Sequence, residues 1–390
     1  MVDVVIAGIG QTPVGEHWDA SLRELALSAI EPTLIDSGGL KPDALFIGNM
    51  FAPHLSSQAH LGALIADFAG LRGIEAATTE ASGASGGAAL RMGYLAIASG
   101  QADVALVVGI EKSTDQVGAP VEAALATSLD SDFESIQGLA PTSLAALVMR
   151  RYLYENNPPR EAFAGFPIIA HANAVNNPNA MFRNLINQEA YNRAGMVSDP
   201  LNLFDVAPQA DGAAALMLTR PELLPAGFPH PRIRVSGSSL VTSSISLHDR
   251  PNPLDFEAAR LSVERACRQA GILPGDADFF ELYDAYSIYA ALSLEAAGLA
   301  PPGQGWRPAQ DGSISLTGKI PVSTMGGFKA RGNPGGATGV YQAVEAVMQL
   351  RGQAGENQIA GARCALIQCL GGPASSAATH VLNILESSTT

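Results

Sequence analysis

Residues 326–339 read Gly326-Gly-Phe-Lys-Ala-Arg-Gly-Asn-Pro-Gly-Gly-Ala-Thr-Gly339, and they end where the pattern predicts a helix at 340–351. A second glycine-rich turn, Gly83-Ala-Ser-Gly-Gly87, precedes a predicted helix at 88–99. Such a turn, between a strand and a helix, places backbone N–H groups and the positive end of the helix dipole at one point. That arrangement suits an anion or a carbonyl oxygen that gains charge, although small residues also allow close helix–sheet packing. Neither turn matches GxxxxGK[ST] or GxGxxG, which argues against nucleotide hydrolysis and hydride transfer.

The two turns occupy equivalent places in the two ends of the chain. The N-terminal third predicts strand 4–8, helix 21–37, strand 44–47, helix 58–69, helix 88–99 and strand 104–108. The C-terminal third predicts strand 233–235, helix 255–271, strand 279–282, helix 286–297, helix 340–351 and strand 364–367. Two halves with the same order of parts indicate an internal duplication about a pseudo-twofold axis.

The middle of the chain, about 115–205, has a different character. It is rich in Asn, Pro and isolated aromatic residues and lacks the alternation of strand and helix, which resumes with a strand at 212–218. We interpret it as an insertion between neighbouring strands, where binding surfaces are common. The predicted domains are an N-terminal half (1–115 plus 205–228), an inserted loop domain on the substrate side (116–204) and a C-terminal half (229–390).

Composition narrows the possible functions. The 390 residues are 47% apolar and 15% charged, as in a well-buried α/β protein, and the formal charge of −14 argues against nucleic acid or an anionic membrane as the main partner. The start of the chain has no signal-peptide pattern, and no apolar run approaches the ~20 residues needed to cross a bilayer, so we expect a cytoplasmic protein. Three cysteines, without a CxxC or His/Cys cluster, predict neither a disulfide framework nor a metal site.

The chain resembles the thiolases, in particular the sterol-carrier-protein type and the archaeal acetoacetyl-CoA thiolases, from end to end. Six motifs carry this resemblance: Gly8-Ile-Gly-Gln-Thr-Pro, Glu80-Ala-Ser-Gly-Ala-Ser-Gly-Gly-Ala-Ala-Leu-Arg91, Gly109-Ile-Glu-Lys112, Leu247-His-Asp-Arg250, Glu281-Leu-Tyr-Asp-Ala-Tyr286 and the 326–339 block. The resemblance implies an α/β thiolase fold with duplicated βαβαβαββ halves in a five-layered α-β-α-β-α arrangement. It also implies a coenzyme A thioester as substrate, with no covalently bound cofactor.

Thiolases carry out Claisen condensation of acyl-CoA thioesters or its reverse. The family normally uses a cysteine thiolate at a helix N-terminus, a histidine that activates it, a second acid/base and two oxyanion holes. Here the motif Cys-Ala-Ser-Gly-Gly has Gly83 in place of the nucleophile, and Gly-His-Pro has Asn333, which cannot take a proton at neutral pH. The branch motif His-Asp-Cys-Phe has become Tyr283-Asp-Ala-Tyr286, which removes an oxyanion-hole histidine and a catalytic cysteine.

Some candidate groups remain. Cys369 lies in Cys-Leu-Gly-Gly, which resembles the motif that holds an acid/base cysteine in other thiolases, although a small buried core thiol is an equal alternative. By resemblance, the backbone N–H groups of Gly83 and Gly371 fall where a main-chain oxyanion hole is built. Tyr283 is a candidate acid/base, with a packed structural tyrosine as the alternative.

Three hypotheses follow. The first is retro-aldol or Claisen-type chemistry on a CoA thioester without an acyl-enzyme, as in the thiolase-like aldolases of steroid side-chain breakdown; those place a second tyrosine near the position of Asn333, where this chain has none. The second is a catalytically inactive subunit or scaffold that supports an active partner enzyme. The third is an acetyl-CoA acyltransferase with a substitute nucleophile such as Ser82 or Ser85. The resemblance further implies a homodimer or a heteromer with another thiolase-like chain, and many relatives bind a small zinc-ribbon/OB-fold protein.

Overall fold

The structure is a computed structural model that describes residues 2–159 and 161–385. Within these residues the chain forms one nine-stranded mixed sheet and a separate two-stranded sheet. The strands are β1 (Val5–Gln11), β2 (Ala44–Gly48), β3 (Glu75–Thr79), β4 (Val104–Glu111), β5 (Met196–Ser198), β6 (Leu201–Asn202), β7 (Gly212–Thr219), β8 (Ile233–Thr242), β9 (Phe279–Glu281), β10 (Cys364–Gly371) and β11 (Ser376–Ile384).

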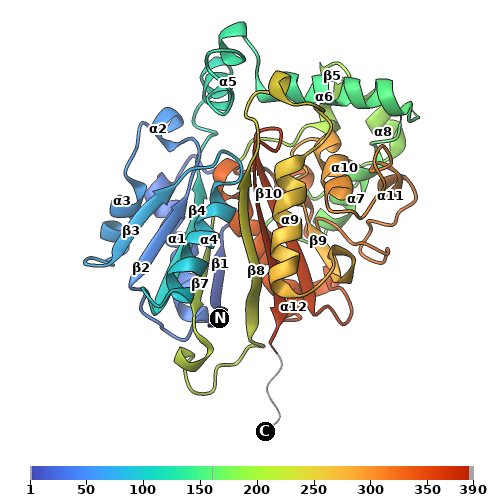
Figure 1. Cartoon of the computed structure of the whole chain (residues 1–390). Helices are drawn as coiled ribbons and strands as arrows, with labels where there is room; N and C mark the ends of the chain where they lie inside the picture. The colour runs from blue at the N-terminus through green and yellow to red at the C-terminus, as the bar shows by residue number, and fades with distance from the viewer. Residues whose placement is uncertain (1, 160, 386–390) are drawn as a thin grey trace.

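Helices cover both faces of the large sheet (Figure 1). They are α1 (Leu22–Asp36), α2 (Ala52–Leu55), α3 (Leu61–Phe68), α4 (Ser85–Ala98), α5 (Ala119–Ala126), α6 (Pro141–Asn156), α7 (Gly165–Ala174), α8 (Gln188–Arg193), α9 (Glu257–Ala270), α10 (Ser287–Ala296), α11 (Arg307–Gln310) and α12 (Thr338–Leu350). In the described part of the chain, none of them combines the length and apolarity that a membrane-spanning helix needs.

The order of the strands shows the two predicted halves. The first half runs β3-β2-β4-β7-β1 and the second runs β8-β11-β10-β9, so β1 corresponds to β8 and β7 to β11. In the second half, Val322 forms a parallel bridge with Phe280 of β9. This bridge takes the place that the pairing of β3 with β2 has in the first half. The strand directions also agree between the two halves. Strands β7 and β11 are antiparallel to both of their neighbours within their half, whereas the pairs β2–β4 and β9–β10 are parallel. The topology confirms the predicted duplication, and β1 pairs with β8 where the halves join.

The helices form three layers around the two half-sheets. Helices α1 and α3 pack on the outer face of the first half-sheet, and α9 and α10 pack on the outer face of the second. Helices α4 and α12 lie between the half-sheets, where their apolar residues share one buried cluster with those of β4, β7 and β10. This is the five-layered α-β-α-β-α arrangement that the resemblance to thiolases implies.

The two glycine-rich turns meet at the start of the central helices. A Cβ atom on Gly86 would lie 2.8 Å from the carbonyl oxygen of Gly336 and 2.9 Å from the nitrogen of Val340. Glycine is therefore required where the N-terminal ends of α4 and α12 touch. This contact brings the loops before both helices to the same end of the molecule.

The inserted region joins two neighbours in the sheet, because β4 and β7 pair antiparallel from Val104 with Thr219 to Glu111 with Gly212. It contains helices α5 to α8 and the small β5–β6 sheet. The sequence pattern predicted no helices here, since the Asn- and Pro-rich segments mask the short helical runs. It also missed β11 and ended β10 at residue 367, because the small residues around Gly371 resemble a loop. The domain boundaries stay a prediction.

His380 on β11 gives a prediction about pH. Its Nε2 lies 3.0 Å from the carbonyl oxygen of Gly87, so Nε2 carries the proton, while Nδ1 is buried without a partner within the described residues. Burial lowers the pKa of His380 to about 4. The neutral ring therefore contributes its full stability above the pKa that His380 has in the unfolded chain. This stability is lost as the pH falls from there through the pKa of His380 in the folded protein.

We expect His380→Gln, which keeps a donor for Gly87, to be less sensitive to acid than the wild type. Between about pH 7.5 and pH 5 the wild type should lose roughly 2 kcal/mol more of its free energy of unfolding than the variant. Urea unfolding of both proteins at both pH values measures this difference. Equal losses would show that His380 titrates as it does in the unfolded chain.

Candidate functional site

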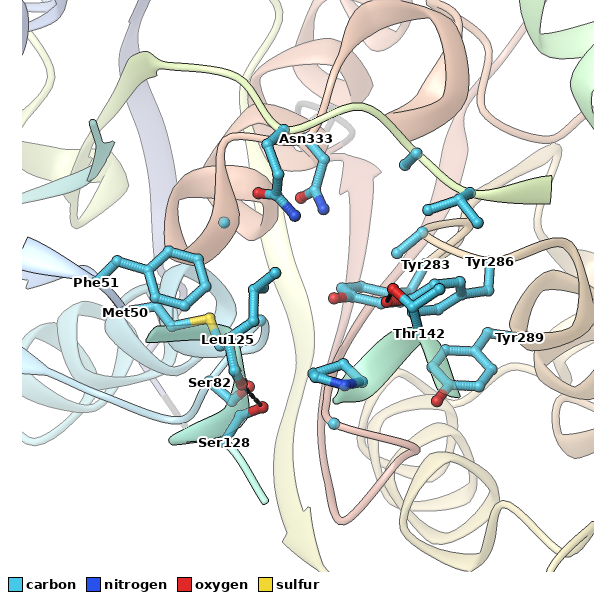
Figure 2. Close-up of a pocket in the computed structure, with 18 of the residues that line it drawn as sticks. Met50, Phe51, Ser82, Leu125, Ser128, Thr142, Tyr283, Tyr286, Tyr289 and Asn333 are labelled. Carbon is cyan, nitrogen blue, oxygen red and sulfur yellow. Dashed lines mark hydrogen bonds between the residues drawn. The ribbon is translucent and has the colours of Figure 1, made fainter. Parts of the chain in front are cut away.

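A cavity of about 170 Å³ lies where the carboxyl ends of strands from both halves face the inserted region. Such edges are common ligand sites in α/β folds. Figure 2 shows Tyr283, Tyr286 and Tyr289 on one side of this cavity, Met50, Phe51 and Leu125 on the other, and the amide of Asn333 directed between them. The remaining lining residues are Ser82, Gly83, Glu122, Ser128, Pro141, Thr142, Val197, Val206, Ala207, Gln209, Ala285, Gly335 and Gly372.

Gly83 and Tyr283 are in direct contact at this cavity. A Cβ atom on residue 83 would collide with the Tyr283 hydroxyl, would lie 3.0 Å from Cε2 of the same ring and would lie 2.7 Å from the Leu370 carbonyl oxygen. Contacts this short do not occur at real Cβ atoms. The Tyr283 hydroxyl therefore occupies the space into which any side chain at position 83 would project.

Tyr283 follows β9 and is held by its surroundings. Its ring packs edge-on against Phe328 with the ring centroids 4.7 Å apart, and only 9% of the residue is exposed. Its hydroxyl has no hydrogen-bond partner within residues 2–159 and 161–385. Burial, followed by the neighbouring Tyr286, raises the pKa of Tyr283 well above its usual value, so the phenol is protonated near neutral pH.

Two further tyrosines face the cavity, and the sequence analysis did not place them there. The Tyr286 hydroxyl lies 3.0 Å from Oγ1 of Thr142, and burial raises the pKa of Tyr286 to about 12. The Tyr286 and Tyr289 rings meet edge to face with centroids 4.9 Å apart. Tyr286 directly precedes α10 and Tyr289 lies in its first turn, so their spacing by three is the signal that could have revealed a shared face. Tyr341, by contrast, hydrogen-bonds Thr12 away from the cavity.

Asn333 lies in the loop before α12, next to Gln209 in the loop before β7. The backbone of Asn333 is fixed at both ends, because its N–H donates to Pro208 (3.0 Å) and its carbonyl accepts from Ala210 (3.2 Å). Within the described chain, neither Oδ1 of Asn333 nor Oε1 of Gln209 has a hydrogen-bond partner, although both atoms are buried. A buried polar atom without a partner costs about 1–3 kcal/mol, so the pair is available to a ligand.

The structure does not bring Cys369 to the cavity. Its thiol is fully buried beneath the start of α4, 3.8 Å from the carbonyl oxygen of Ala84 and 3.9 Å from that of Ala378. Burial raises the pKa of Cys369 to about 12, which disfavours the thiolate. We therefore leave Cys369 out of the proposed catalytic groups, in favour of the core-thiol alternative. Gly371 is not among the lining residues either, although Gly372 is.

Glu111, from the motif at 109–112, holds the two halves together beside the cavity. Its carboxylate accepts from the backbone N–H groups of Met50 (2.9 Å), Phe51 (3.1 Å) and Gly336 (3.0 Å), and from Nδ2 of Asn49 (2.9 Å). Burial raises the pKa of Glu111 to about 7, and these donors oppose that rise. One carboxylate thus fixes a cavity loop of the first half to the turn that precedes α12.

Comparison with known proteins agrees with this fold. The model "Thiolase, N-terminal domain" matches residues 4–222 and "Thiolase C-terminal domain-like" matches residues 239–384. The chain is thus an α/β protein of the thiolase fold. It belongs to the thiolase family and is a thiolase-like relative of acyl-CoA enzymes.

Individual relatives support the same assignment. The chain is 40% identical over 385 residues to the acetyl-CoA acetyltransferase of Methanothermobacter thermautotrophicus, covering 98% of this chain and 100% of that protein. It is 28% identical over 316 residues to sterol carrier protein 2 of Bos taurus, covering 77% of this chain and 58% of that one. The solved structure of an Ltp2-ChsH2(DUF35) aldolase has the same fold, with a TM-score of 0.82 over 98% of each chain at 24% identity.

Proposed function

We propose that this protein binds a coenzyme A thioester and breaks or forms a carbon–carbon bond without an acyl-enzyme. The observation that carries the proposal is the contact between Gly83 and Tyr283, in which a phenol fills the space of a side chain at position 83. By resemblance, position 83 is where thiolases hold the nucleophilic cysteine. A hydroxyl group that can transfer a proton then stands in the cavity instead of a thiol that can be acylated.

The reaction we propose interconverts a 3-hydroxyacyl-CoA with a shorter acyl-CoA and an aldehyde or ketone. In cleavage, the 3-hydroxyl loses its proton, the Cα–Cβ bond breaks and Cβ becomes a carbonyl carbon. The electron pair of that bond passes into the enolate of the thioester, and Cα then takes up a proton. Such a reaction needs a proton-transferring group and donors for the enolate oxygen, but no covalent intermediate.

We assign the proton transfer to Tyr283. In bond formation, its neutral phenol protonates the oxygen that develops at Cβ, and cleavage follows the same path in reverse through the phenolate. The N–H of Gly83, before the start of α4, is the proposed donor to the thioester oxygen. Tyr286 takes the place of the second tyrosine that is absent at position 333, since its hydroxyl lies at the same cavity.

Cleavage of 3-hydroxyacyl-CoA thioesters by the purified chain tests this proposal. We expect a shortened acyl-CoA and an equimolar aldehyde or ketone, which chromatography and hydrazone trapping detect. The control is a 3-ketoacyl-CoA with free coenzyme A, for which we expect no thiolysis. Thiolysis without aldol cleavage would reject the proposed reaction.

The substitute-nucleophile hypothesis has less support. Ser85 is fully buried and its hydroxyl donates to the Ser82 carbonyl (2.6 Å). Ser82 does line the cavity, but no histidine is among the lining residues that the structure describes, so nothing there can activate a serine.

We expect that incubation with an acyl-CoA leaves the mass of the intact protein unchanged, with under about 1% covalent adduct at saturation, because the site lacks an activated nucleophile. Intact-protein mass spectrometry after acid quenching measures this. A thiolase that retains Cys-Ala-Ser-Gly-Gly serves as the positive control. A stoichiometric acyl adduct on Ser82 would instead support the acyltransferase hypothesis.

We further propose that the chain assembles with a second thiolase-like chain, either a copy of itself or a different one. Strand β3 ends the large sheet with an exposed edge, and Met92 and Leu95 are 43% and 41% exposed on α4. Unpaired strand edges and exposed apolar residues favour such pairing. Light scattering of the purified chain tests self-association. Aldol cleavage that requires a co-purified thiolase-like or zinc-ribbon/OB-fold protein would favour the supporting-subunit hypothesis.

A further inference from the structure

Two neutral amides, those of Gln209 and Asn333, stand side by side at the cavity. The resemblance to thiolases supplies no role for Gln209. Gln209 and Asn333 are bridged through their backbones, so their side chains leave the chain at adjacent points. Asn333 is only 8% exposed, and Figure 2 shows its amide directed into the cavity. Within the described residues both side-chain oxygens lack a partner. Two unpartnered amides at one cavity indicate a polar ligand group between them.

We propose that Gln209 and Asn333 together recognise the 3-hydroxyl group of the acyl-CoA, a proposal that rests on the function proposed above. A hydroxyl group both donates and accepts, and an amide pair offers acceptors and donors whichever way each amide is turned. The lining residues that the structure describes include one carboxylate, Glu122, which is exposed. The neutral interior therefore suits an uncharged polar group rather than a second carboxylate or a phosphate.

The amide pair makes the hydroxyl a determinant of specificity. An acyl-CoA that lacks the hydroxyl would enter the cavity and leave both amides without partners. Sites built to hydrogen-bond a substrate hydroxyl reject the analogue that lacks it far more strongly than apolar pockets reject an extra methylene. The substrate class is thus 3-hydroxyacyl thioesters, and thioesters without the 3-hydroxyl group are disfavoured at binding rather than at the chemical step.

The volume of the cavity limits the length of the acyl chain in the thioesters used for the test. A cavity of about 150 Å³ is known to hold benzene, so one of about 170 Å³ accepts a group of about six carbon atoms. 3-Hydroxybutyryl-CoA and butyryl-CoA fit this limit and differ only in the hydroxyl group. Both enantiomers of the hydroxy compound are used, since the proposal does not depend on which one binds.

The test measures dissociation constants for these two thioesters by calorimetry on Tyr283→Phe protein, in which we expect turnover to be at least ~10²-fold slower. We expect 3-hydroxybutyryl-CoA to bind at least 10-fold more tightly than butyryl-CoA. In the Tyr283→Phe/Gln209→Met protein, where a side chain of similar length cannot hydrogen-bond the ligand, the preference should fall to within about 2-fold. A preference that survives the Gln209 substitution overturns the proposal.

Gln11→Leu, on the same Tyr283→Phe background, is the matched control. Its Oε1 is also buried without a partner within the described chain, yet Gln11 is not among the cavity residues. The 10-fold preference should remain in this control, and its loss would overturn the assignment to the amide pair. The Tyr283→Phe protein also tests the proposal by itself. Equal affinities of this protein for the two thioesters refute the proposal even if the Gln209 variant fails to fold.

Binding and turnover separate the two proposals. If wild-type protein prefers the hydroxy thioester but releases no acetyl-CoA and acetaldehyde from it, hydroxyl recognition stands and the proposed cleavage fails. If turnover occurs without a binding preference, the cleavage stands and the role of the amides fails.

Discussion

Replacing Tyr283 by phenylalanine should lower kcat for cleavage of a 3-hydroxyacyl-CoA by at least ~10²-fold, the usual range for loss of a positioned acid/base group. The substitution removes only the hydroxyl, and the ring keeps its edge-on packing against Phe328. KM should change little, because the proposed amide pair of Gln209 and Asn333 stays in place. A steady-state assay of shortened acyl-CoA measures both constants.

The pH dependence adds an independent check on Tyr283. Burial raises its pKa, so the phenolate that cleavage requires is scarce near neutral pH. The cleavage rate of the wild type should therefore rise about tenfold per pH unit on the alkaline side, whereas Tyr283→Phe should not show this dependence. Tyr94→Phe is the control, because Tyr94 is buried in α4 and bonds Gln269 rather than lining the cavity. Unchanged turnover in Tyr283→Phe would remove Tyr283 from the mechanism.

Introducing a cysteine at position 83 should destroy the proposed aldol activity rather than create a thiolase. The new Cβ would collide with the Tyr283 hydroxyl and lie 2.7 Å from the Leu370 carbonyl oxygen, which belongs to the backbone and cannot move freely. We expect overpacking to cost about 1–3 kcal/mol of the free energy of unfolding and the displacement of Tyr283 to lower aldol cleavage at least ~10²-fold. Thermal unfolding and the cleavage assay measure the two effects.

Two variants separate crowding from the mere presence of a thiol. Gly195→Cys introduces cysteine where no atom lies within 4 Å of the added Cβ, so stability and turnover should stay near wild type. Adding Tyr283→Ala to Gly83→Cys should recover part of the lost stability, because the ring contacts are removed while the Leu370 contact remains. A stable Gly83→Cys protein that forms an acyl-enzyme and cleaves 3-ketoacyl-CoA would contradict the structural argument.

The sequence predicts much of the fold because the duplicated pattern is strong. The glycine-rich turns at 83–87 and 332–339 mark the starts of the two central helices, and the structure places them in contact. Strand β11 escapes prediction because its first residues are small and follow a tight turn. Its place is fixed instead by pairing with β8 and β10, which the local sequence does not encode.

The site was predicted in part. Gly83, Tyr283 and Asn333 come from separate motifs, and all three line one cavity, although their roles stay proposals. The sequence alone does not show whether Cys369 faces the cavity, because a strand residue points to one face or the other depending on register. Gln209 carried no signal at all, since only the pairing of its loop with the loop of Asn333 brings it to the cavity.

The mutual exclusion of a side chain at position 83 and the phenol of residue 283 has an evolutionary consequence. A cysteine introduced at position 83 meets the phenol, while loss of the phenol alone leaves the cavity without the proposed proton-transferring group. Each of the two positions therefore decides how a substitution at the other affects the proposed activity, which is a form of sign epistasis. Under the proposed chemistry, a change between a nucleophilic side chain at position 83 and a catalytic phenol at position 283 therefore requires substitutions at both positions.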